Sequence, residues 1–122
     1  MAFGPGGRGV VGSSTQGDGV EGFASGATNA AVAASNPNGV GLRVRGSVQI
    51  LGSSAGSVTL PAGATTQTVT AAVATAQSLV LLTPLQDPGA RLWISGRAAG
   101  SFTISASGPM PAPVTIQYLV IN

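Results

Sequence analysis

A short unit of glycine and valine recurs in the first part of the chain. Residues 7–13 (GRGVVGS) and 17–23 (GDGVEGF) align at a shift of ten and keep every glycine and the central valine. A looser copy over residues 31–35 replaces glycine with alanine, and another copy begins at Gly39. Each copy offers only one or two small apolar side chains between glycines. Such units cannot build a core within one chain, so they need stacking or the packing of several chains around an axis.

Glycine also marks a boundary in the chain. Twelve of the 19 glycines lie at or before Gly46, and beyond it short runs rich in Val, Ile and Thr alternate with Pro and Gly. That second pattern is typical of an antiparallel sandwich or small barrel. Because apolar and polar residues alternate over residues 42–50, across the boundary, we expect continuous strand to join the two parts. We predict two domains, residues 1–46 and residues 47–122.

The expected fold class is all-β. With so few repeats, intertwined chains are favoured over a single-chain solenoid, so the first domain is predicted to be a short glycine-rich β-helical stem in a trimer. The second domain is predicted to be a small antiparallel β-sandwich with strands over residues 48–51, 56–60, 66–73, 78–84, 90–97, 101–107 and 114–121. Residues 98–100 should form a hairpin loop. Alternation assigns eleven side chains to the core: Val58, Leu60, Val69, Leu92, Ile94, Phe102, Ile104, Val114, Ile116, Tyr118 and Val120.

Two of the expected strands carry apolar side chains on both faces, over residues 79–82 and at Leu119 and Ile121. A sandwich of about 75 residues is marginal by itself, so a second apolar face is most simply a subunit interface. The alternative is that a loop of the same chain covers these residues. The predicted interface residues are Val10, Val20, Val32, Val40, Leu119 and Ile121.

The residue types that carry most catalysis and metal binding are absent or scarce. The chain has no Cys, His or Lys, and its three carboxylates are Asp18, Glu21 and Asp87. Ser and Thr nucleophiles therefore lack a basic partner. A paired-carboxylate site could come only from Asp18 and Glu21 or from association between chains. We expect no enzyme, no cofactor and no metal site.

Charge and hydropathy also exclude two classes of partner. Five scattered arginines give a formal net charge of +2 but form no track along a phosphate backbone, so we expect no nucleic-acid binding. The N-terminus lacks the basic leader and apolar segment of a signal peptide. The longest aliphatic run, residues 79–82, is too short to span a bilayer, so no transmembrane segment and no membrane partner are expected.

The order of these motifs carries a family resemblance. The GVVGSS and GVEGFA units are followed by residues 39–46, 56–63, 78–86, 99–104 and 115–122. In this order they resemble uncharacterised bacterial and phage-associated proteins with Gly-Val-x-Gly-x-Ser repeats before a C-terminal β domain. The layout is also similar to trimeric phage tail-fibre and virion-appendage proteins, in which a β-helical stem supports a β-sandwich head. The resemblance implies a place on a virion or an extracellular surface, and it transfers no functional residue.

Two hypotheses follow for function. The first is a non-catalytic structural or attachment protein, a homotrimeric appendage or decoration on a phage virion or bacterial surface structure, whose partners are its own copies and other proteins of that structure. The second is a lectin-like module that binds a cell-surface glycan or receptor through Trp93, with Arg91 and Arg97 beside it. In the competing interpretation, Trp93 packs in an interface and the arginines solvate its rim.

Overall fold

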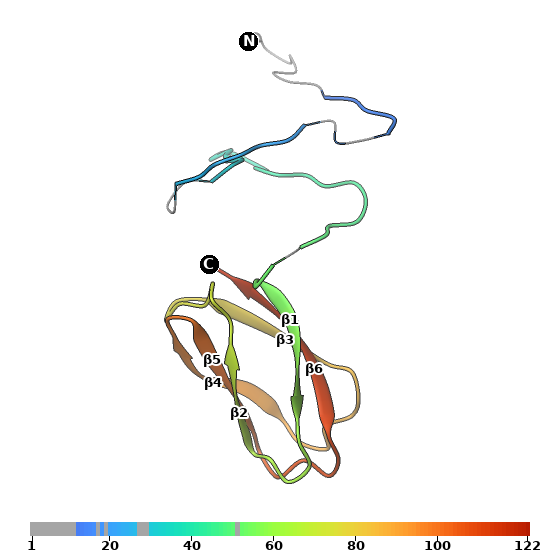
Figure 1. The fold of residues 1–122 in the computed structure, drawn as a ribbon, viewed down its shortest axis with the longest axis vertical. Helices are drawn as coiled ribbons and strands as arrows, with labels where there is room; N and C mark the ends of the chain where they lie inside the picture. Colours follow the sequence, from blue (N-terminus) through green and yellow to red (C-terminus); the bar gives the residue numbers. More distant parts are fainter. Residues whose placement is uncertain (1–11, 17, 19, 27–29, 51) are drawn as a thin grey trace. The chain divides into compact units, whose positions relative to one another are not determined.

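The computed structural model describes residues 12–16, 18, 20–26, 30–50 and 52–122. The chain divides into two compact units, unit 1 (Met1–Ser47) and unit 2 (Val48–Asn122). The described residues contain no helix, and their strands form two small antiparallel sheets in unit 2 (Figure 1). The all-β prediction is therefore confirmed.

Each sheet of unit 2 has three strands. Their bounds are β1 (Ala55–Leu60), β2 (Thr66–Thr70), β3 (Leu79–Pro84), β4 (Leu92–Ala98), β5 (Ser101–Ala106) and β6 (Val114–Ile121). Sheet A has the order β1-β6-β3, and sheet B has the order β2-β5-β4. These strands overlap six of the seven predicted ones. The predicted hairpin loop is also confirmed, because Ala98 pairs with Ser101 and Gly100 adopts the positive φ of 77° that a tight turn requires.

The two sheets are halves of one long antiparallel ribbon that is rolled over itself. β1 pairs with β6 and β2 pairs with β5, and the two crossovers between these pairs stay hydrogen-bonded to each other. The amide of Gly63 donates to the carbonyl of Met110 at 2.8 Å, and the amide of Met110 donates to the carbonyl of Ala64 at 3.1 Å. β3 and β4 then add to the free sides of β6 and β5. This connectivity is that of a jelly roll with fewer strands.

A single apolar core lies between the sheets. All eleven side chains predicted for the core are found there. Seven of them are buried, and Val58, Leu92, Ile94 and Tyr118 are partly buried against the others. The sequence pattern missed Met110, which projects into the core from the crossover before β6, and Ala71 and Ala74 in the loop after β2. These three lie outside strands, where alternation gives no assignment.

The pair Gly56 and Tyr118 shows how closely the core is packed. The two residues are direct partners in the ladder of β1 and β6. The Tyr118 ring meets Phe102 of the opposite sheet edge-to-face, with 5.1 Å between ring centroids. A Cβ at position 56 would lie 2.6 Å from the Tyr118 hydroxyl and 2.8 Å from its Cζ. The tyrosine ring therefore occupies the space that a side chain at position 56 would need.

The predicted strand over residues 48–51 is wrong in its described part. Residues 48–50 belong to no strand, and the side chains of Val48 and Ile50 are exposed. Residue 51 lies outside the described residues. Alternation shows which side chains would share a face, but a strand also needs a neighbouring chain to complete its hydrogen-bonded ladder. In the described structure no such neighbour pairs with residues 48–50, so the join between the two parts is not continuous strand.

Unit 1 has no strand or helix among its described residues, and the β-helical stem remains a prediction. Its extended segments nevertheless pass close to one another (Figure 1). A Cβ at Gly22 would lie 2.8 Å from Cγ2 of Val32, and a Cβ at Gly41 would lie 3.1 Å from the carbonyl oxygen of Ala34. Glycine at these two positions permits the close approach of neighbouring backbones, as the repeat indicates.

Gly56→Ala should destabilise unit 2 by about 1–3 kcal/mol, because the added methyl group forces the Tyr118 ring away from Phe102. The free energy of unfolding, measured by urea denaturation, tests this expectation. Gly108→Ala is the matched control, since a Cβ there meets no atom within 4 Å. Equal stability of the two variants would contradict the packing described for Tyr118.

Candidate functional site

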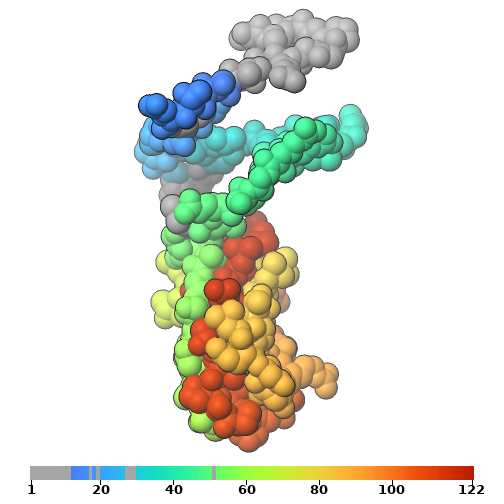
Figure 2. All heavy atoms as spheres, turned by 90° about the vertical axis from the view of Figure 1, so that its right-hand side faces the viewer, coloured from blue at the N-terminus to red at the C-terminus, as the bar shows by residue number. Residues whose placement is uncertain are grey.

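The outer face of sheet A is apolar at one end and polar at the other. The ladder between β3 and β6 pairs Leu79 with Ile121 and Leu81 with Leu119 on this face. Figure 2 looks onto it and shows β6 (red) between β1 (green) and β3 (yellow). Farther along the same two strands the outward pair is Thr83 and Gln117. We call the four residues Leu79, Leu81, Leu119 and Ile121 the sheet A patch.

The sheet A patch is open to solvent in the single chain. Leu79, Leu81 and Ile121 are each about half exposed, at 54%, 48% and 45%, and Leu119 is half-buried. The alternative that a loop of the same chain covers them finds no support in the described residues. A shallow groove lined by Leu81 and Leu119 runs between β3 and β6.

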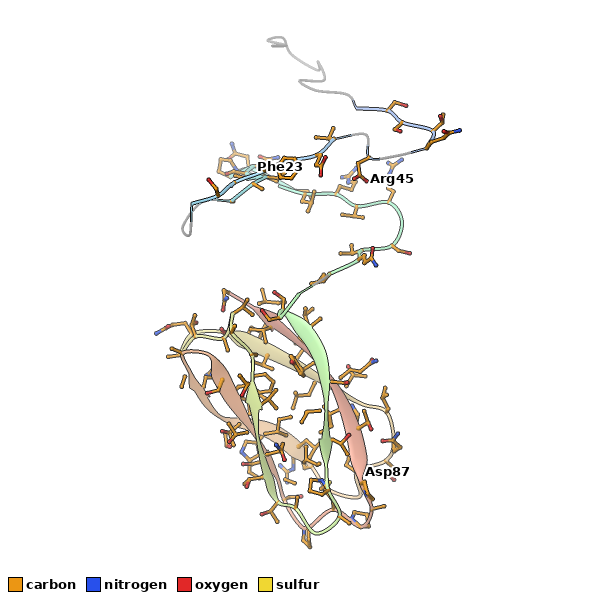
Figure 3. All side chains as sticks on the ribbon, in the orientation of Figure 1. Phe23, Arg45 and Asp87 are labelled. Atoms are coloured by element: carbon orange, nitrogen blue, oxygen red, sulfur yellow. The ribbon has the colours of Figure 1, made fainter. Side chains whose placement is uncertain are left out.

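The interface residues predicted in the repeat are also exposed. Val20, Val32 and Val40 are 66%, 70% and 60% exposed, and Val10 lies outside the described residues. Phe23, which stands in unit 1 together with Arg45 (Figure 3), is 85% exposed. Apolar side chains in unit 1 are therefore not buried by the described part of their own chain.

The outer face of sheet B has the opposite character, because hydroxyl groups cover most of it. It carries Thr66, Thr68 and Thr70 on β2, Ser101, Thr103 and Ser105 on β5, and Ser95 on β4. Several of these groups bond across strands. The hydroxyls of Thr68 and Thr103 lie 3.3 Å apart, and that of Ser105 donates to that of Ser95 at 2.6 Å.

Trp93 is the one large apolar side chain on this hydroxyl-bearing face. Leu92 and Ile94 take the inward positions of β4, so the pleat turns Trp93 outward, opposite Ser105. The small serine leaves the indole 44% exposed. Covering the remaining indole surface would contribute roughly 2 kcal/mol. Trp93 therefore offers an uncovered aromatic surface to a ligand or to another chain.

Arg91 and Ser107 line a shallow depression of about 340 Å³ beside Trp93. The backbone amide of Arg91 donates to the Ser107 hydroxyl at 3.0 Å, and the amide of Ser107 donates to the carbonyl of Arg91 at 2.9 Å. These two bonds fix the backbone of Arg91 against the end of β5. No ion pair to the Arg91 guanidinium is found among the described residues.

Arg97 lies away from this depression, because a β-bulge separates it from Trp93. Between Ile94 and Gly96 the register shifts by one residue, so Arg97 pairs with the inward-facing Phe102. An uninterrupted strand would have put Arg97 on the face of Trp93. Its guanidinium instead donates from Nη1 to the carbonyl of Ser78 at 2.8 Å. Of the three predicted ligand-binding residues, the structure brings Arg91 and Trp93 together and places Arg97 elsewhere.

Ser78 is the centre of a polar network that sequence reasoning missed. Its side chain is fully buried, accepts from the amide of Thr75 at 2.8 Å and donates to the side chain of Asn122. Asn122 in turn donates from Nδ2 to the carbonyl of Val73 at 2.7 Å. The network ties the residue after β6 to the loop between β2 and β3. Arg97 of β4 joins it by donating to the carbonyl of Ser78. A single buried serine gives no signal in sequence, because two of its partners, Asn122 and Arg97, are distant along the chain.

The described residues hold no cluster of three or more His, Asp, Glu or Cys side chains that could bind a metal ion. Asp18 and Glu21 lie in unit 1, and Asp87 lies in the loop after β3 (Figure 3), where its Oδ1 accepts from the amide of Gly89 at 2.9 Å. Within the described part of the chain, no helix has the length and apolar character needed to cross a membrane. No protein-family profile and no curated protein matches the chain.

Ser78→Ala should lower the free energy of unfolding by about 1–3 kcal/mol, because it leaves the Thr75 backbone amide and the Oδ1 atom of Asn122 without their partner. Thermal or urea unfolding measures the change. Ser57→Ala removes a hydroxyl from an exposed position of β1 and should leave stability within about 0.5 kcal/mol of the parent. A Ser78→Ala variant as stable as Ser57→Ala would mean that the network does not hold the end of the sandwich.

Proposed function

We propose that this protein is a non-catalytic structural or attachment protein that assembles as a homotrimer. One observation carries the proposal: every described side chain of unit 1 is exposed, although the unit contains several large apolar residues. These are Val20, Phe23, Val32, Val40, Leu42 and Val44.

Ordering a backbone costs about 1–2 kcal/mol per residue, and burial of apolar surface is the main term that offsets it. The described residues of unit 1 have no such burial within their own chain. The close backbone approach at Gly22 and Gly41 favours segments stacked side by side, as in an intertwined stem. Further copies of the same chain would supply the missing cover, and three copies around an axis give each segment two equivalent neighbours.

The sheet A patch supports the same proposal from unit 2. Its leucines and isoleucine gather at one end of a sheet whose other end is polar, which is the distribution expected of a contact and not of random exposure. The two outward pairs of β3 and β6 present an aliphatic surface with a shallow groove along it. Contact between copies through this surface would add burial that a core of this size lacks.

The location of the assembly is proposed from the family resemblance. Gly-Val repeats before a β domain indicate an appendage or decoration on a phage virion or bacterial surface structure, with other proteins of that structure as partners. An appendage of this kind needs a stable shape but no reactive groups. The absence of Cys, His and Lys from the chain agrees with such a role. The lectin-like alternative is favoured by a separate observation, the uncovered Trp93 beside Arg91, and does not conflict with a trimer.

The mass in solution tests the trimer directly. Light scattering coupled to size-exclusion chromatography should give 35.4 kDa, three times the 11.8 kDa of one chain. The same mass should persist on dilution, since interlocked chains separate slowly. A mass of 11.8 kDa would overturn the proposal, and a much larger mass would replace the trimer with a shell or filament.

A substitution in the sheet A patch tests whether that surface is part of the contact. Ile121→Asp should shift the trimer toward monomer, because it places a charge against an apolar surface that association would cover. Thr83→Asp is the matched control, since Thr83 lies on the same outer face beyond the patch. Chromatographic mass at equal protein concentration distinguishes the two. If both variants keep the parent mass, the contact lies elsewhere in the chain.

A further inference from the structure

We propose that the depression formed by Trp93, Arg91 and Ser107 binds an anionic saccharide, a sugar unit that carries a carboxylate. The inference is independent of the oligomeric state. It rests on three properties of the depression: an indole that is 44% exposed, an arginine that forms no ion pair with the described residues, and a border of neutral hydroxyl groups.

The aromatic face fits the apolar side of a sugar ring. The indole of Trp93 is held on the outside of sheet B by the pleat of β4, and its cross-strand partner, Ser105, is too small to cover it. A pyranose ring has one face of C–H groups and a rim of hydroxyls. Stacking that face on the indole would bury apolar surface of both partners while the sugar hydroxyls stay free to form hydrogen bonds.

The charge comes from Arg91. Its backbone is fixed by the two hydrogen bonds with Ser107, so the base of the side chain is positioned next to Trp93. The chain has only three carboxylates, and Asp18, Glu21 and Asp87 all lie outside sheet B. A guanidinium that forms no ion pair within the described part of the chain, on a face without acidic residues, favours a carboxylate ligand held by two parallel hydrogen bonds.

The hydroxyl groups complete the site. The Ser107 oxygen accepts the Arg91 amide, which leaves its own proton available to a ligand. The neighbouring outer positions of β5 and β2 are also hydroxyl-bearing and uncharged. Such groups can donate to and accept from sugar hydroxyls. A single-stranded nucleic acid, the other ligand class that combines a flat ring with negative charge, requires successive aromatic platforms, and Trp93 stands alone on this face.

Trp93 is the only tryptophan of the chain, so its fluorescence reports on this depression alone. We would titrate the 122-residue chain with a galacturonic-acid trimer and with the neutral galactose trimer. The acidic trimer should change the emission and should bind at least about tenfold more tightly than the neutral one, because only it engages Arg91. Equal weak binding of both sugars would remove the role of Arg91, and no binding of either would overturn the proposal.

Variants measured by calorimetry assign the binding to named side chains. Trp93→Ala should abolish binding of the acidic trimer, and Arg91→Gln should lower its affinity to that of the neutral trimer. The matched controls are Leu85→Ala, which shortens an exposed apolar side chain elsewhere on unit 2, and Arg43→Gln, which removes one positive charge from unit 1. Both controls should bind as the parent does. An equal loss in Arg43→Gln and Arg91→Gln would mean that net charge alone attracts the sugar.

Two further outcomes would overturn the proposal in favour of another occupant. If acrylamide cannot quench Trp93 in the assembled protein without sugar, the indole is covered by another copy of the chain. If a short single-stranded oligonucleotide binds more tightly than the acidic trimer and loses affinity in Trp93→Ala, the depression serves nucleic acid. Unfolding midpoints are measured for both site variants, because Trp93 is partly covered on sheet B and its truncation can lower stability, so binding is compared at temperatures where both variants are folded.

Discussion

The strand pleat of β5 and β6, the central strands of the two sheets, sets the chemistry of every surface of unit 2. Each central strand is paired on both sides, so its register decides which face its neighbours' side chains take. On β6, Ile116 and Val120 point into the core and Leu119 and Ile121 point outward. A slip of one residue would exchange those sets. The hydrogen-bonded crossovers at Gly63 and Met110 help to hold the registers of both sheets, because they continue the ladder of one sheet into the other.

The two units differ in how far they bury their apolar side chains. Unit 2 rolls a single ribbon so that each sheet covers the other, and its core is made within one chain. Unit 1 has glycine where such a ribbon would need large side chains, so its described segments approach closely and still leave Val32 and Val40 exposed. In the trimer proposed above, unit 2 brings an apolar core of its own, whereas unit 1 would gain burial only by association. Concentration and oligomeric state should therefore affect unit 1 more than unit 2.

Alternation in sequence was enough to predict the six strands that form, among seven predicted, and all eleven core side chains, because each central strand obeys a period of two without interruption. It failed where the structure departs from that period. The bulge at Ser95 and Gly96 turns Arg97 away from Trp93, and Gly96 is its only signal in the sequence, since glycine inside a strand often marks a bulge. Residues 48–50 alternate but have no partner. Ser78 and Met110 act through contacts between segments far apart in the chain, which a single sequence does not reveal.

Because the chain has few charged residues, the outer faces of sheets A and B carry almost none, and the two faces differ in how they meet solvent. A face without charged groups must either hydrogen-bond water or be covered. Sheet B takes the first course, because hydroxyls such as those of Thr68 and Thr103 satisfy one another and water, and only Trp93 interrupts them. On sheet A, Leu81 and Ile121 are about half exposed in the single chain, and the contact proposed between copies would cover them. Assembly through sheet A would leave sheet B facing solvent, so a contact between copies and a depression for a small ligand can occupy one small sandwich without competing for surface.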